Sequence, residues 1–329
     1  MVHVHRRGRF PKLVLLIAAA ALAAAGCGGP DLGKENFGRT TVPAAAGADS
    51  SAPITDPAVT PAALRDLQPC QFVGQSALAE LGTTQEAPEP SAVRFDSCRA
   101  AVTDPGGKQI TIEVDVGTTV PSAADRTTGQ VSGLPQVEVP AGTGSCTVSV
   151  LTSRNPDLGV SFQIDYSGGD ACPVGRTLAA AAAQTLHGSP QKYAPAKGTL
   201  VDADPCAVLD KGAVAAVVPG AEPEAAGLHS CRWGTSVYVE VLFLPGRPPS
   251  EGSGWLKADA GTPSQAFRKQ GTAGGSNCQV HWPHRPWQDD RVETAQLEYQ
   301  NAAGDAASDD PCGKAVGLAR QLAGKLPKP

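Results

Sequence analysis

Cysteine is the residue type in this chain with the widest range of possible chemistry, and the nine cysteines follow a pattern. Cys27 closes an apolar leader, and the other eight form two sets of four at similar intervals. Structural zinc sites and redox sites both use closely spaced Cys-x-x-Cys pairs, which this chain lacks. We therefore predict that the eight are structural and bind no metal: Cys70, Cys98, Cys146 and Cys172, then Cys206, Cys231, Cys278 and Cys312.

Residues 1–26 are typical of a secretory signal peptide, with a basic start, an apolar stretch and small residues before Cys27. The apolar stretch is shorter than the roughly 20 residues that span a membrane, so we expect cleavage. Ala24-Ala25-Gly26-Cys27 resembles the lipobox of bacterial lipoproteins. The resemblance implies that Cys27 becomes the lipidated first residue, anchored on the outer face of the cell membrane. A free cysteine behind an ordinary cleavage site is the alternative.

The eight remaining cysteines predict disulfides, because an exported chain meets an oxidising compartment. Each set of four allows three pairings, which leaves nine schemes for two independent units. We favour pairing between neighbours in sequence, which would fasten helix starts to strands: Cys70 with Cys98, Cys146 with Cys172, Cys206 with Cys231, and Cys278 with Cys312. Two such bonds, at about 2–4 kcal/mol each, would rival the net stability of a small domain.

Residues 281–287, with the sequence His-Trp-Pro-His-Arg-Pro-Trp, form the most unusual segment, which we expect in a turn between two strands. His281 and His284 could share a metal ion, but no third ligand is evident. Arg285 and Trp287 are residue types that dominate binding hot spots, so the segment is a possible recognition loop. A packed hairpin tip without a ligand is the simpler alternative.

Catalytic motifs are missing from the sequence. No Gly-x-Ser-x-Gly elbow, His-Glu-x-x-His pair or phosphate-binding glycine loop occurs. We therefore expect no catalysis and no cofactor, although a triad assembled only in space would escape this test. Loss of the leader removes four cations and takes the formal charge from −5 to −9. That balance disfavours nucleic acid as a partner.

The spacing of the cysteines predicts a tandem duplication. Residues 27–60, rich in Gly, Pro, Ala, Ser and Thr, should form a disordered tether behind the lipidated cysteine. We place a first α+β unit at 61–190 and a second at 191–329, each an antiparallel sheet of about four strands with helices on one face.

The same elements are expected in both units. Helices should start at Pro69 and Pro205 and end near Leu81 and Val218. Alternating apolar residues predict strands over 110–116 and 237–243, with one buried face. A later strand in each unit should contain the third cysteine of the set, and a further strand should end at equivalent tyrosines, Tyr166 and Tyr299. Final helices are predicted over 173–186 and 311–326.

The second unit resembles the actinobacterial lipoprotein family called domain of unknown function 3558. The resemblance rests on Asp204-Pro205-Cys206, Cys231-Arg232-Trp233, the glycine-rich approach to Cys278, and Asp310-Pro311-Cys312, and it covers residues 200–327. The first unit is a diverged copy, in which Ala100 replaces the tryptophan. The resemblance implies the outer face of an actinobacterial cell membrane and brings no activity.

The sequence thus favours a lipid-anchored extracytoplasmic binding or scaffold protein that contacts the membrane through its anchor and an unknown protein or envelope ligand through its loops. A carrier of an apolar molecule or lipid, held between sheet and helices, is the first alternative. An envelope enzyme with a spatially assembled site is the second.

Overall fold

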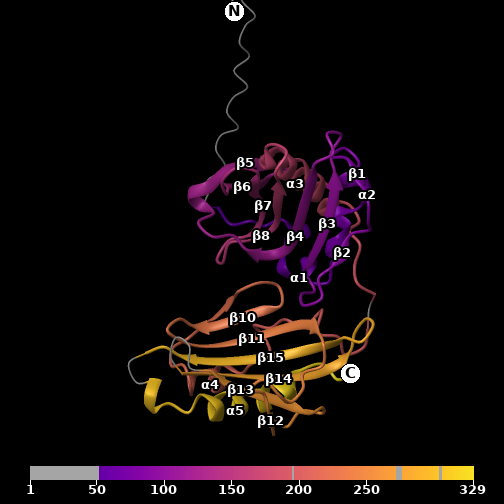
Figure 1. Cartoon of the computed structure of the whole chain (residues 1–329). Helices are drawn as coiled ribbons and strands as arrows, with labels where there is room; N and C mark the ends of the chain where they lie inside the picture. Colours follow the sequence, from indigo (N-terminus) through magenta and orange to yellow (C-terminus); the bar gives the residue numbers. More distant parts are fainter. Residues whose placement is uncertain (1–51, 195, 272–275, 304–305) are drawn as a thin grey trace, which may run out of the picture. The chain divides into compact units, whose positions relative to one another are not determined.

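The computed structural model describes residues 52–194, 196–271, 276–303 and 306–329. The signal peptide and Cys27 lie outside these residues. No helix in the described ranges is long and apolar enough to cross a membrane. Two antiparallel sheets, each with helices, make an α+β fold, as predicted (Figure 1).

The first sheet has eight strands in the order β1-β3-β4-β8-β7-β6-β5, with β2 also paired to β3. The strands have these bounds: β1 (Thr83–Thr84), β2 (Glu89–Pro90), β3 (Ser97–Thr103), β4 (Gln109–Thr119), β5 (Thr127–Val131), β6 (Leu134–Pro140), β7 (Ser145–Ser153) and β8 (Leu158–Tyr166). The predicted alternation holds in β4, where Ile110, Ile112 and Val114 are buried while Thr111 and Glu113 are only half-buried. One face of this sheet therefore supplies the core.

The second sheet has seven strands in the order β12-β13-β14-β15-β11-β10-β9. Their bounds are β9 (Pro223–Ala225), β10 (Ser230–Gly234), β11 (Val237–Gly246), β12 (Leu256–Ala258), β13 (Ala266–Gly271), β14 (Ser276–Pro286) and β15 (Val292–Asn301). Val239, Val241 and Phe243 of β11 are buried in a core with Trp282 and Tyr299. Both sheets contain more strands than the four or so expected, because short edge strands are added.

Helices cover the apolar face of each sheet. The α-helices are α1 (Pro61–Leu64), α2 (Gln75–Leu78), α3 (Ala171–His187), α4 (Lys211–Ala215) and α5 (Pro311–Lys325). The 3-10 helices are η1 (Pro57–Val59), η2 (Pro69–Val73), η3 (Ala124–Arg126) and η4 (Ala306–Ser308). The two long closing helices match the prediction, and Asp310 caps α5 by accepting a hydrogen bond from the Gly313 backbone N–H at 2.9 Å.

The helices expected at Pro69 and Pro205 are wrong in length. Extended backbone at Gly74 separates η2 from α2, and extended backbone at Asp210 precedes the short α4. Asp204 still accepts a hydrogen bond from the Cys206 N–H at 2.9 Å, but it caps a turn rather than a helix. The Asp-Pro and Gln-Pro patterns in the sequence thus marked where the chain turns, but they did not determine how long the following helices are.

All four predicted disulfides are confirmed, and each joins neighbouring cysteines in the sequence. The bonds are Cys70–Cys98, Cys146–Cys172, Cys206–Cys231 and Cys278–Cys312. Three of them fasten a helix start to a strand of a sheet, at η2, α3 and α5, and the bond at Cys206 fastens a turn to β10.

The folded part begins before the predicted tether boundary at residue 60. Val59 of η1 is fully buried in the first core, and Ile54 packs against the same core. Asp56 caps η1 and bonds the His187 ring at 2.6 Å. The domain division near residue 190 stays a prediction.

Candidate functional site

The edge of the first sheet is interrupted beside β3. Thr84 of β1 pairs with Val102, whereas Glu89 of β2 pairs with Arg99. Four residues, 85–88, therefore face only Ala100 and Ala101 and must leave the plane of the sheet. We call residues 85–88 the arch.

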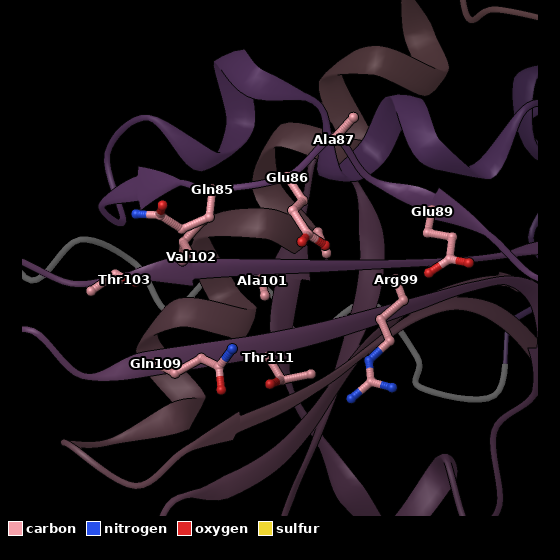
Figure 2. Close-up of a pocket in the computed structure, with 11 residues that line it drawn as sticks. Gln85, Glu86, Ala87, Glu89, Arg99, Ala101, Val102, Thr103, Gln109 and Thr111 are labelled. Carbon is pink, nitrogen blue, oxygen red and sulfur yellow. The ribbon is translucent and has the colours of Figure 1, made fainter.

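The space between the arch and β3 is a groove of about 400 Å³. That volume lies within the range of small-ligand sites, roughly 300–1,000 Å³. Figure 2 shows the arch side chains on one side and the strand side chains on the other. The groove, which we call the arch groove, is lined by Gln85, Glu86, Ala87, Glu89, Arg99, Ala100, Ala101, Val102, Thr103, Gln109 and Thr111.

Charged groups stand on both sides of the arch groove. Glu86 and Glu89 lie on the arch side, and the Arg99 guanidinium lies on the strand side. All three side chains are exposed, and none has an ion-pair partner among the described residues. The site therefore presents two carboxylates and one guanidinium that are available to a ligand.

The polar face around the arch groove is acidic. Arg99 lies opposite Glu113 in the strand register, and Thr111 lies opposite Asp165. Glu113 accepts a long hydrogen bond from the Ser97 hydroxyl at 3.4 Å. Carboxylates thus outnumber the Arg99 guanidinium, so the local field favours a cationic ligand.

At the equivalent position of the second sheet, the edge strand pairs without interruption, so no groove opens between β9 and β10. Glu224 of β9 lies opposite Arg232 of β10, as Glu89 lies opposite Arg99. Here the pairing continues through Trp233, whose indole is buried. The Arg232 guanidinium donates twice to Glu240, at 2.6 and 3.1 Å, and lies over the Tyr238 ring.

These contacts make the two equivalent sheet positions chemically different. In the first sheet Ala100 occupies the position of Trp233, and Thr111 occupies that of the tyrosine. Arg99 therefore lacks the ring that Arg232 lies over. Glu113 occupies the position of Glu240, but no hydrogen bond or ion pair joins it to Arg99 among the described residues. The sequence signal was the missing tryptophan at Ala100, but the register that opens the groove was not readable from it.

The side chains that line the arch groove can bind a ligand. The described residues that line it include no histidine, cysteine, serine or lysine, so it offers neither a Ser–His nor a Cys–His pair. Charge, hydrogen bonds from two glutamines and two threonines, and small apolar contacts remain. Elsewhere in the described part of the chain, one cluster has metal-ligand spacing, at Glu138, Cys146 and Cys172. Its two cysteines are joined in a disulfide and cannot act as thiolate ligands.

The segment predicted as a recognition loop is mostly strand, so the expected turn is wrong. β14 continues to Pro286, and the turn after it is closed by the Trp287 N–H, which donates to the Arg291 carbonyl at 2.9 Å. His281 lies on the opposite face of β14 from the buried Val280 and Trp282, and its ring centroid is 4.3 Å from that of Trp255.

The other three residues of this segment are held by internal contacts. His284 bonds the Gly198 carbonyl at 2.8 Å through Nε2. Arg285 donates to the fully buried Glu293 at 2.6 Å. Trp287 is half-buried and packs edge-on against Tyr193, with 5.4 Å between ring centroids. The structure thus does not gather the four side chains into one exposed site, and a recognition role for them stays a prediction.

Comparisons with known proteins give no functional assignment. No protein-family model and no curated protein matches the chain. Among solved structures, the di-domain ARO/CYC BexL from the BE-7585A biosynthetic pathway is 10% identical, with a TM-score of 0.17, and the match covers 82% of this chain and 90% of that one. DynU16 from the dynemicin biosynthetic locus is 12% identical, with a TM-score of 0.16, covering 83% and 92% of the two chains. These similarities are too weak to support an argument about function.

Proposed function

We propose that this chain is a lipid-anchored extracytoplasmic binding or scaffold protein of the cell envelope, that it carries no catalytic activity, and that the arch groove is its ligand site. The observation that carries the binding role is the open edge of β3, where Glu86, Glu89 and Arg99 have no ion-pair partner among the described residues. The equivalent position in the second sheet supports the same interpretation. There the Arg232 guanidinium is hydrogen-bonded to Glu240, whereas Arg99 has no ion-pair partner among the described residues.

The lipid anchor rests on the leader and on the cysteine count. Eight of the nine cysteines form four disulfides, which leaves Cys27 outside them. Disulfides persist in oxidising compartments, in agreement with export. The lipobox-like sequence before Cys27 and the resemblance to domain of unknown function 3558 favour the outer face of the cell membrane.

Fractionation of cells that express the full chain tests the anchor. We expect the wild type in the membrane fraction, with an acylated N-terminal cysteine by mass spectrometry of the mature protein. Cys27→Ala should leave the chain unacylated and should move it out of that fraction. Ser91→Ala, a change in the folded part, is the control and should not alter the distribution. Equal membrane retention of wild type and Cys27→Ala would rule out the anchor.

A further inference from the structure

We propose that the arch groove binds a short basic peptide segment in extended form, with a lysine or arginine side chain at Glu86 and Glu89 and a peptide carbonyl or carboxylate at Arg99. This inference rests on the proposed function and names the ligand class of the same groove. Shape, hydrogen-bonding capacity and charge each point to this ligand.

The shape of the arch groove fits an extended chain. Five consecutive residues of β3, Arg99 to Thr103, line it, so the groove runs along the strand. At roughly 3.3 Å per residue, that length accommodates about four residues of extended peptide. Its walls carry Ala87, Ala100 and Ala101 rather than large apolar side chains. A narrow polar chain is therefore accommodated better than a bulky ring system.

The hydrogen-bonding groups of the groove match those of a peptide. Gln85 and Gln109 each offer both an amide donor and an amide acceptor, and Thr111 offers a hydroxyl. A peptide backbone presents N–H and C=O groups in alternation, and each needs a partner when it leaves water. Amide side chains on both sides of the groove can supply such partners.

Charge decides which peptides fit. The carboxylates of Glu86 and Glu89 on the arch side would attract a cationic side chain of the peptide and would repel an acidic one. Glu113 and Asp165 on the neighbouring strands strengthen the negative field. Arg99 is the one cation among the described lining residues and can donate to a carbonyl or carboxylate oxygen of the same ligand.

Binding of labelled peptides to the full acylated chain in detergent tests the proposal. The probe is a fluorescein-labelled Ala-Lys-Ala-Ala, compared with peptides that carry Gln or Glu in place of Lys. We expect the lysine peptide to bind at least about fivefold more tightly than the Gln peptide, with the Glu peptide weakest, and the preference to shrink as salt rises.

Glu86→Gln with Glu89→Gln should weaken binding of the lysine peptide by roughly fivefold and should abolish its advantage over the Gln peptide. Glu224→Gln is the matched control, because Glu224 occupies the equivalent register position opposite Arg232 in the closed copy. It should leave peptide affinity unchanged. Exposed Glu→Gln changes keep size and shape, and equal thermal unfolding midpoints would verify that all variants are folded.

Three results would overturn the inference: no binding of the lysine peptide up to millimolar concentration, equal binding of the three peptides, or an equal loss in the Glu224→Gln control. Failure here is separable from failure of the anchor. If the chain reaches the membrane fraction but does not bind basic peptides, only the proposed ligand class is refuted. A chain that binds them but is not acylated refutes only the anchor.

Discussion

His281 shows how one half-buried side chain can make this protein sensitive to acid. Its ring lies against Trp255, and its Nε2 atom is buried without a hydrogen-bond partner among the described residues. Burial lowers the pKa of His281 from 6.5 to about 4, because the charged imidazolium would lose its hydration there. Lys269, which lies over the same tryptophan, is a cation and offers no partner for a proton.

The pKa of His281 predicts a pH dependence of stability. The unfolded chain binds a proton at this residue below pH about 6.5, whereas the folded chain does so only near pH 4. The free energy of unfolding should therefore fall as the pH drops through this window, by up to about 1.4 kcal/mol per pH unit. Urea unfolding from pH 4 to 7 measures it, and His281→Phe should flatten the slope. An unchanged slope in that variant would contradict the assignment.

The predicted equivalence of Tyr166 and Tyr299 is wrong. Tyr166 and Tyr299 follow the third cysteine of each set by similar intervals, which suggested equivalence. In the sheets, however, Cys146 lies opposite Ile164 while Cys278 lies opposite Tyr299. Tyr299 is therefore equivalent to Ile164, and Tyr166 lies two residues further along its strand. Counting along the chain cannot detect this, because a shift of two keeps a side chain on the same face.

The connection before the second sheet is tied to β14 and β15 by side chains that the sequence had suggested for recognition. Glu293 is fully buried and accepts hydrogen bonds from the Thr199 hydroxyl at 2.8 Å, the Leu200 N–H at 2.6 Å and Arg285 at 2.6 Å. His284 holds the Gly198 carbonyl nearby. This is the part of residues 281–287 with the clearest structural role.

Arg285→Ala should destabilise the fold by about 2–3 kcal/mol, because it removes the only cation that pairs with the buried Glu293 carboxylate among the described residues. Urea or thermal unfolding at pH 7 measures the loss. Arg247→Ala is the control, since Arg247 is exposed and has no ion-pair partner within the described ranges. A loss below about 0.5 kcal/mol at Arg285 would show that the pair does not stabilise the fold.

Alternation made the central strands predictable, whereas the edges were not. The apolar period over 110–116 and 237–243 required one buried face, and β4 and β11 have it. The arch groove depends instead on how two-residue strands β1 and β2 meet β3, and such short pairings carry no periodic signal. The candidate site therefore had to come from the structure, although the substitution of Ala100 for tryptophan hinted at divergence.

At the scale of the whole molecule, the four disulfides are the dominant covalent restraint on the described residues. Each closes a loop of 25 to 34 residues between a local turn or helix start and a strand. The sequence alone left three pairings open in each set of four, and pairing between neighbours was favoured because it fastens helix starts to strands. The structure selects that scheme.

Removal of all four bonds should prevent stable folding. At about 2–4 kcal/mol each they together match or exceed the roughly 5–15 kcal/mol net stability of a typical domain. Protein reduced in denaturant and then returned to buffer with reductant should lack near-ultraviolet circular dichroism and a cooperative thermal transition. Oxidised protein carried through the same denaturation without reductant is the control. Recovery of the native spectrum in the reduced sample would contradict this role.

The arch contains four residues opposite two residues of β3, and is thus two residues longer than an unbroken ladder would need. Thr84↔Val102 and Glu89↔Arg99 belong to registers that differ by two, so a deletion of Glu86 and Ala87 would bring both into one ladder. Because strand side chains alternate with a period of two, every flanking residue would keep its face. The proposed ligand groove therefore depends on chain length alone: a deletion of two residues should close it while the core and all four disulfides stay in place.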